Sequence, residues 1–154
     1  MGMLDGKVAL VTGAGGGLGR AHAILLAKEG AKVVVNDLGG ARDGTGASAS
    51  MADGVVDEIN AAGGQAVAHY GSVTSKEDAQ GMVQAAVDSF GKIDILIANA
   101  GILRDKSFKN MTDDMWDVVM DVHLRGTYLV TKIAYDVMIE QGTGGRIIMT
   151  LSLI

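Results

Sequence analysis

The sequence predicts an α/β fold in which a parallel sheet carries helices on both faces. Short apolar runs alternate with longer segments whose apolar residues recur every three or four positions. A glycine-rich turn over residues 12–19 directly follows the first apolar run, and another run ends in Asn99-Ala100-Gly101. Regular alternation of strands and helices favours a parallel sheet with right-handed crossovers.

The expected elements can be placed in order along the chain. Five short apolar runs have the pattern of buried parallel strands, at residues 7–11, 32–36, 65–69, 93–98 and 146–151. Four amphipathic helices are predicted between them, at residues 20–29, 51–62, 76–90 and 113–141. Ser75 and Thr112 are expected to cap the last two helices. The apolar stripe of the last helix is expected to contain Met115, Val119, Val122, Gly126, Leu129, Ile133 and Val137.

We expect one doubly wound domain over residues 1–154, with the strand order 3-2-1-4-5. In such a sheet, ligands bind at the carboxyl ends of the strands beside the point where the strand order reverses. That point lies between the first and fourth strands, where the turn at 12–19 and Asn99-Ala100-Gly101 both fall. Residues 38–50 are rich in Gly, Ala and Ser, and we expect a long functional or mobile loop there.

The turn at 12–19 has the composition of a phosphate-binding turn. Glycines let the backbone approach a pyrophosphate, and the helix that follows offers free N–H groups and the positive end of its dipole. Any tight strand-to-helix turn can be glycine-rich, so the turn counts mainly in combination with Asp37. An acid at the end of the second strand accepts hydrogen bonds from the adenosine ribose and repels a 2′-phosphate, which favours NAD over NADP. The alternative is an ordinary strand-end aspartate.

Composition argues against several other functions. The 154 residues contain 13 Lys and Arg and 18 Asp and Glu, for a net charge of -5, so no nucleic-acid or acidic-membrane partner is expected. No apolar run approaches the ~18 residues of a membrane-spanning helix. The chain has no Cys, and its His residues lack metal-ligand spacing, so no metal site is expected. His22 and His69 are expected to be solvent-facing or helix-face residues.

Together these segments resemble the short-chain dehydrogenase/reductase family, which has a Rossmann-type fold. The resemblance rests on Thr12-Gly13-x-x-x-Gly17-x-Gly19, Asp37, Asn99-Ala100-Gly101 and the strand at 146–150. A narrower resemblance, to the (3R)-hydroxyacyl-CoA dehydrogenase domain of the type 2 multifunctional β-oxidation enzymes, rests on residues 35–40, 99–105, 122–126 and 145–150. A flavodoxin-like receiver domain is disfavoured, because Thr12-Gly13 stands where that fold has acidic residues.

The resemblance implies an NAD-dependent oxidoreductase that oxidises 3-hydroxyacyl-CoA-type or other secondary alcohols by hydride transfer. It also implies a homo-oligomer formed through the helix at 113–141. For the cellular location we expect the cytoplasm, with the peroxisomal matrix as the alternative.

The resemblance also implies cofactor-binding roles for particular residues. Gly13, Gly17 and Gly19 would shape the pyrophosphate turn, with Leu18 near the nicotinamide and Asp37 on the ribose. Ser72 and Val73 would flank the adenine, although Gly71 replaces an Asp that relatives often have there. Asn99, Ala100 and Gly101 would line the cofactor.

Two residues are implied as catalytic. Ser152 matches the Ser that orients the substrate, and His123 stands where the wider family usually has an Asn that supports the proton relay. The family's general acid/base is a Tyr beyond that Ser, with a Lys one helical turn later. Only Leu153 and Ile154 follow Ser152 in this sequence. Tyr128, Lys132 and Tyr135 belong to the preceding long helix, so we do not expect them in this role.

We therefore expect a dehydrogenase fold that lacks the C-terminal strands and helices of the full family fold. The fifth strand would become an apolar edge, which promotes association, and these residues alone would show no more than trace activity. The alternative function is a catalytically inactive NAD-binding fragment, or a truncated isoform, that associates with full-length subunits.

Overall fold

The computed structural model describes residues 2–151, so the predicted catalytic residue Ser152 lies outside the described residues. The described chain forms a five-stranded parallel sheet in the order β3-β2-β1-β4-β5, which confirms the predicted topology. The strands are Val8–Thr12 (β1), Lys32–Asn36 (β2), Gln65–His69 (β3), Ile95–Ala98 (β4) and Arg146–Met149 (β5).

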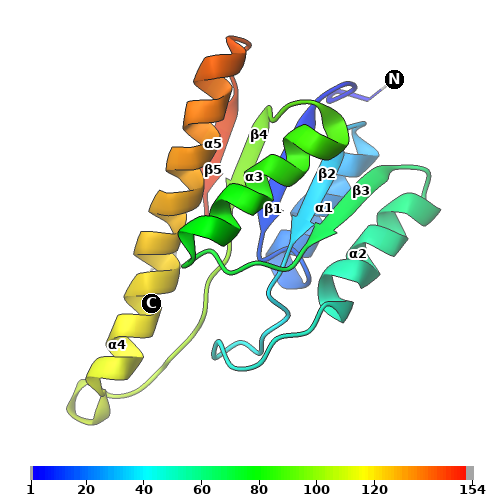
Figure 1. Ribbon diagram of the computed structural model, residues 1–154. Coiled ribbons are helices and arrows are strands. Elements are labelled where there is room, and N and C mark those ends of the chain that lie inside the picture. Colours follow the sequence, from blue (N-terminus) through cyan, green and yellow to red (C-terminus); the bar gives the residue numbers. More distant parts are fainter. Residues whose placement is uncertain (1, 152–154) are drawn as a thin grey trace.

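Helices cover both faces of the sheet (Figure 1). Helices α1 (Gly17–Lys28) and α2 (Ser50–Ala61) pack on one face, and α3 (Lys76–Phe90) and α5 (Thr127–Gln141) pack on the other. All five residues of β1 are buried. Its side chains alternate between the two layers: Val8 and Leu10 join the core under α3 and α5, and Ala9 and Val11 join the core under α1 and α2. This double cover explains why Val8–Val11 is an unbroken apolar run.

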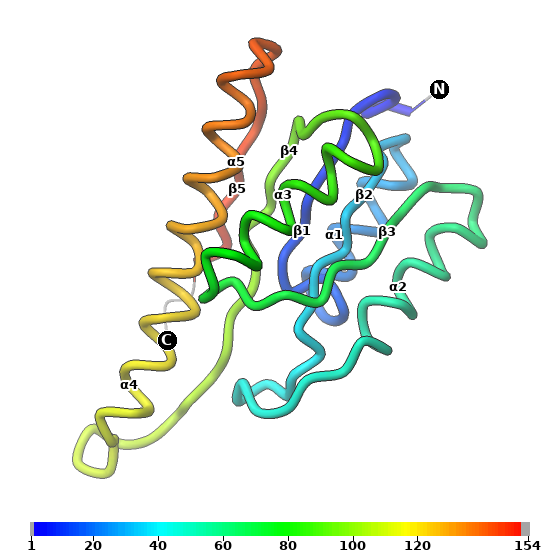
Figure 2. The backbone as a smooth tube through the Cα atoms, viewed as in Figure 1, coloured from blue at the N-terminus to red at the C-terminus, as the bar shows by residue number. Residues whose placement is uncertain are grey.

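The predicted helix at 113–141 is one continuous rod with an irregular middle. Figure 2 shows the chain running from β4 through a long extended segment to the start of this rod. A short 3-10 turn, Phe108–Asn110 (η1), precedes α4 (Asp113–Met120), and a π-helical turn, Asp121–Gly126 (η2), joins α4 to α5. Apolar spacing did not predict the π-helical turn, because its wider hydrogen-bond register leaves no mark in the sequence.

Gly126 is buried, as the predicted stripe requires, but beyond it the most buried positions of this rod lie one residue past the predicted ones. They are Val130, Ala134 and Met138, whereas the predicted positions Val122, Leu129, Ile133 and Val137 are only half-buried. Gly126 and Ala134 are small and let the helix backbone approach the layer beneath it. A Cβ added to Gly126 would lie 2.6 Å from Val73 Cγ2. No residue of α4 is buried, so Met115 and Val119 are not core residues.

The helix starts differ in how they are capped. Ser75 Oγ accepts a hydrogen bond from the Asp78 amide at 3.2 Å, and Thr112 Oγ1 accepts one from the Met115 amide at 3.4 Å, so both predicted caps are confirmed. Helix α1 has no side-chain cap. The first N–H groups of a helix lack intrahelical partners, so the start of α1 leaves backbone donors for another acceptor.

The last strand of the sheet, β5, has an uncovered outer edge in the described part of the chain. Among residues 2–151, β5 pairs with β4 and leaves its other side as an edge, with Ile148, Met149 and Leu151 exposed. The expectation that the fifth strand is an apolar edge is confirmed for this part of the chain. No helix over these residues is long and apolar enough to cross a membrane.

Candidate dinucleotide-binding site

The glycine turn between β1 and α1 requires glycine for two different reasons. At Gly13 and Gly19 there is no room for a side chain. A Cβ on Gly13 would lie 2.8 Å from Ala100 Cα, and one on Gly19 would lie 2.1 Å from the Gly13 oxygen. Gly17 has a φ of +51° but faces open space, with no atom within 4 Å of an added Cβ. The turn is therefore packed against β4 on one side and open where α1 begins.

Asp37 lies directly after β2 and contacts this turn. Its Oδ2 accepts a hydrogen bond from the Gly15 amide at 2.7 Å, and its Oδ1 accepts one from the Gly39 amide at 2.7 Å. The carboxylate thus joins the glycine turn to the loop that follows β2, a structural role that the sequence did not predict. Each carboxylate oxygen accepts more than one hydrogen bond, so acceptor capacity remains for a ligand hydroxyl.

Hydrogen bonds of Asn99 and Thr12 connect the carboxyl ends of β1, β4 and β5. The amides of Asn99 and Ala100 both donate to Thr12 Oγ1, each at 3.0 Å. Asn99 Nδ2 donates to the oxygens of Thr12 and Gly13 at 3.2 and 3.3 Å, and Thr150 Oγ1 donates to Asn99 Oδ1 at 3.2 Å. The predicted segment 99–101 is thereby brought to the glycine turn. Thr12 was not predicted as a site residue, and its hydroxyl organises this junction.

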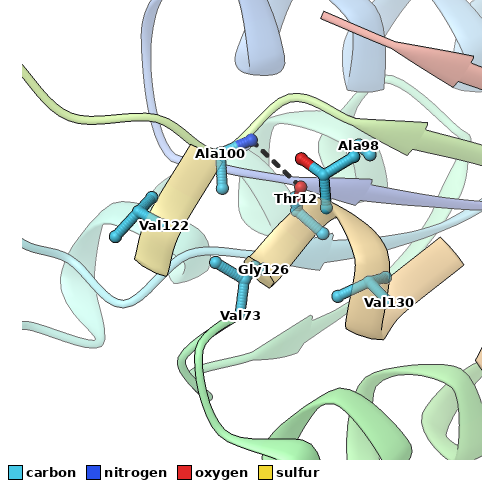
Figure 3. Close-up of a pocket in the computed structure, with 8 residues that line it drawn as sticks. Thr12, Val73, Ala98, Ala100, Val122, Gly126 and Val130 are labelled. Carbon is cyan, nitrogen blue, oxygen red and sulfur yellow. Dashed lines mark hydrogen bonds between the residues drawn. The ribbon is translucent and has the colours of Figure 1, made fainter. Parts of the chain in front are cut away.

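A narrow crevice separates these strand ends from the rod formed by η2 and α5 (Figure 3). Thr12, Ala98 and Ala100 line it from the sheet, and Val122, Gly126, Thr127 and Val130 line it from the helices. Val73 enters the same crevice and is 8% exposed. Because the Val73 side chain belongs to this packing, a contact with adenine would come from its backbone.

The turn after β3 carries the predicted residues Ser72 and Val73. A Cβ on Gly71 would lie 2.6 Å from His69 Cε1 and 2.7 Å from Asp78 Cβ, so an Asp does not fit at position 71. Asp78 of α3 supplies a carboxylate there instead, and its Oδ2 accepts a hydrogen bond from the Ser72 amide at 2.8 Å. His69 lies on β3, is half-buried and accepts the Gly71 amide on Nδ1 at 3.1 Å, so the expectation of a solvent-facing or helix-face residue was wrong.

His123 lies in η2, and its imidazole packs on the segment that follows β4. Its Nε2 is 3.0 Å from the Ile102 nitrogen and 2.8 Å from the Ile102 oxygen. A Cβ on Gly101 would lie 2.8 Å from its Cε1, so Gly101 makes room for the ring. Single π-helical turns occur often at functional sites. Here the turn brings His123 to the carboxyl end of β4, beside the predicted Asn99-Ala100-Gly101 segment.

The other candidates lie away from this junction. Leu18 is exposed at the start of α1. Tyr128 and Lys132 have the spacing of the family's Tyr-x-x-x-Lys pair, but both side chains are exposed on α5, and Lys132 Nζ pairs with the Asp136 carboxylate. Within residues 2–151, no three His, Asp or Glu side chains gather as metal ligands would.

Comparison with known proteins gives relatives that match nearly all of this chain. The mouse protein "Peroxisomal multifunctional enzyme type 2" is 54% identical over 148 residues, which is 96% of this chain and 20% of the mouse protein. "Hydroxyacyl-CoA dehydrogenase ChsB1" from Mycobacterium tuberculosis is 49% identical over 135 residues, which is 85% of this chain and 40% of that protein. The chain therefore spans less than half the length of these curated relatives.

A solved structure and a family profile agree with these matches. The crystal structure of a short chain dehydrogenase from Mycobacterium avium matches with a TM-score of 0.88 and 46% identity, over 98% of this chain and 56% of that chain. The profile of the family described as short chain dehydrogenase matches residues 7–154. The chain belongs to the short-chain dehydrogenase family.

Proposed function

We propose that this chain forms the NAD-binding part of a dehydrogenase that oxidises 3-hydroxyacyl-CoA-type alcohols. The observation that carries the proposal is the Asp37 carboxylate, which lies at the end of β2 and accepts a hydrogen bond from Gly15 within the glycine turn. An acid in this position selects a free ribose hydroxyl, because a 2′-phosphate would place like charges side by side.

The start of α1 supplies the second requirement, a place for the pyrophosphate. The helix begins at Gly17 without a side-chain cap, and an added Cβ there would meet open space. Backbone N–H groups and the helix dipole stabilise an anion at such an end. The donors present therefore fit a dinucleotide, with Gly13, Gly17, Leu18 and Gly19 at the pyrophosphate turn, and Ser72 and Val73 on the adenine side.

We place the nicotinamide end of the cofactor at the carboxyl end of β4. A bound nicotinamide would accept the hydride, and Asn99, Ala100 and Gly101 would line its pocket. We propose that His123 positions the backbone of Ile102, with which it has close contacts, next to the substrate. Ser152 is proposed to orient the substrate hydroxyl. The substrate class is supported by the relative from Mycobacterium tuberculosis, which is named a hydroxyacyl-CoA dehydrogenase.

The rod of α4, η2 and α5 is the proposed interface of a homo-oligomer. Large apolar side chains are exposed along it, namely Trp116, Met120, Leu124, Tyr128, Tyr135 and Ile139. Exposed apolar patches of this kind mark interaction surfaces. For the cellular location, the mouse relative is named a peroxisomal enzyme, which favours the peroxisomal matrix over the cytoplasm.

Calorimetric titration with NAD, ADP-ribose and NADP tests the cofactor assignment. We expect NAD and ADP-ribose to bind, and NADP to bind at least about tenfold more weakly, because its 2′-phosphate would lie beside the Asp37 carboxylate; tenfold corresponds to about 1.4 kcal/mol. Equal affinities for NAD and NADP would contradict the role of Asp37. Failure of all three ligands to bind would contradict the dinucleotide site itself.

A second candidate is a cofactor-binding chain that associates with other subunits and does not turn over by itself. The large apolar side chains exposed along the rod favour it, because such patches mark interaction surfaces. Formation of NADH from a 3-hydroxyacyl-CoA tests the second candidate. Turnover on the order of 1–10³ per second by these residues alone would rule it out, whereas NAD binding with no more than trace turnover is expected of both candidates.

A further inference from the structure

The turn at residues 71–73 is held by three neighbouring elements at once. The Gly71 amide donates to His69 Nδ1 of β3 at 3.1 Å, and Asn36 Nδ2 of β2 donates to the Gly71 oxygen at 3.0 Å. The Ser72 amide donates to Asp78 Oδ2 of α3 at 2.8 Å. His69 is the one member of this set whose charge changes near neutral pH. Its protonation state therefore bears directly on the position of the turn.

The contacts define which nitrogen of His69 carries the proton. A peptide N–H can only donate, so Nδ1 must accept the Gly71 amide through a lone pair, and the proton of the neutral ring sits on Nε2. Asn36 Nδ2 is a second donor, 3.3 Å from the same Nδ1. Its amide orientation is fixed independently, because it also donates to the Gly71 oxygen. Protonation of Nδ1 would place its N–H against two other donors.

The surroundings of the ring favour the neutral form. Glycines approach it from two sides: an added Cβ would lie 2.6 Å from Cε1 at Gly71 and 3.0 Å from Nε2 at Gly81. Burial lowers the pKa of His69, and the negative charge of Asp78 partly opposes that shift. Asp78 is the charged group that faces the ring from α3, the facing side chain from β2 is the neutral Asn36, and the turn presents only backbone at Gly71.

We propose that His69 is a positioning residue for the adenine side of the cofactor site. Its neutral, Nε2-protonated imidazole holds the Gly71 amide and so fixes Ser72 and Val73 against the adenosine. Protonation breaks that hydrogen bond, loosens the turn and weakens adenosine binding. This inference rests on the dinucleotide site proposed above, although the contacts of His69 do not depend on any ligand.

Titration of ADP-ribose between pH 5.5 and 7.5 tests the effect on binding. One linked proton changes affinity by at most about tenfold per pH unit, and we expect the dissociation constant of the unchanged chain to rise about three- to tenfold as the pH falls across this range. His69→Asn keeps an acceptor near the position of Nδ1 but does not titrate, so its affinity should stay flat. His69→Phe removes the acceptor and should bind weakly at every pH. His22→Asn is the matched control and should keep the original slope.

Nitrogen NMR of the histidine rings tests the contact itself without a ligand. We expect the Nε2-protonated tautomer of His69 at pH 7.5, and a Gly71 amide shift that titrates with His69 and is absent in His69→Asn. An Nδ1-protonated ring at that pH would overturn the inference, and so would an unchanged pH slope of ADP-ribose affinity in His69→Asn. If ADP-ribose binds with an affinity that does not depend on pH, only the role of His69 is contradicted. If ADP-ribose does not bind at any pH, the dinucleotide site is contradicted as well.

Discussion

The two sides of the sheet differ in how far the described residues bury the strands and pair their polar groups. On the side of β1 and β2, the strands are buried and the polar groups at their carboxyl ends are paired, as at Thr12, Asp37 and Asn99. On the side of β5, the strand is mostly exposed, and the rod beside it carries apolar side chains in solvent. The proposed cofactor side is therefore packed and paired within these residues, whereas β5 and the rod leave apolar side chains exposed.

We assign cofactor binding to the buried side at β1 and β2, and the substrate-side chemistry to residues nearer the exposed side. The proposed cofactor contacts come from backbone and short side chains that the core holds in place. The proposed substrate-side residue His123 lies instead on η2, next to an α4 without buried residues. Regions with few buried contacts open more readily than the core. We expect changes on the cofactor side to cost stability and binding together, and changes on the β5 side to affect association.

Thr12→Val gives the largest expected effect on stability. The substitution leaves the amides of Asn99 and Ala100 without their acceptor at a residue that is 1% exposed. A buried donor left without a partner costs about 1–3 kcal/mol, so the free energy of unfolding should fall by about 2–4 kcal/mol in urea denaturation. Thr12→Ser keeps the hydroxyl and should lose much less. Equal losses in the two variants would contradict the role of this hydroxyl.

Gly19→Ala should have the next largest effect. Its new Cβ would lie 2.1 Å from the Gly13 oxygen, so the turn must shift. Overpacking typically lowers the free energy of unfolding by about 1–3 kcal/mol. Because the turn shifts, ADP-ribose should also bind more weakly. Gly54→Ala is the matched control, because Gly54 is an exposed residue of α2 with no atom near an added Cβ. This control should gain about 0.5–1 kcal/mol from helix propensity. Parallel urea denaturations and ADP-ribose titrations measure both effects, and normal ADP-ribose binding by Gly19→Ala would contradict the prediction.

The stability of the cofactor side should depend on pH through His69. Burial lowers the pKa of His69 below the ordinary value of 6.5, so below pH 6.5 the unfolded chain binds a proton that the folded chain resists. Stability contributed by the neutral ring is thus present above pH 6.5 and is lost as the pH falls. Urea denaturation between pH 5.5 and 7.5 should show this fall in the unchanged chain and much less of it in His69→Asn.

Leu124→Gln should have the smallest effect on unfolding and the clearest effect on association. Leu124 is 64% exposed on the rod, so the free energy of unfolding of the monomer should change by no more than about 0.5 kcal/mol. Sedimentation velocity should show weaker self-association. Leu25→Gln on α1 is the control, since Leu25 is 58% exposed but lies on the other face of the sheet. If both variants lower association equally, the rod is not the interface.

The strand order and the glycine turn were predictable because they depend on local patterns. Alternating apolar runs predicted the topology, and Ser75 and Thr112 predicted two helix starts. The roles of Thr12, Asp78 and His69 were not predictable, because each depends on how separate segments meet in the fold. Thr12 contacts Asn99, Asp78 contacts the turn at Ser72, and His69 contacts Asn36 of β2. The most buried positions of α5, Val130 and Ala134, lie one residue past the predicted stripe because of close packing, which apolar spacing alone does not reveal.

Hydrogen exchange with and without ADP-ribose tests the contrast between the two sides most directly. The ligand should slow exchange of backbone amides over residues 13–20, 37–40 and 71–74, because those segments form the proposed cradle. Amides of α4, α5 and β5 should exchange as before. Protection confined to residues 113–141 and 146–149 would contradict the account, since the ligand would then bind on the side that we assign to association.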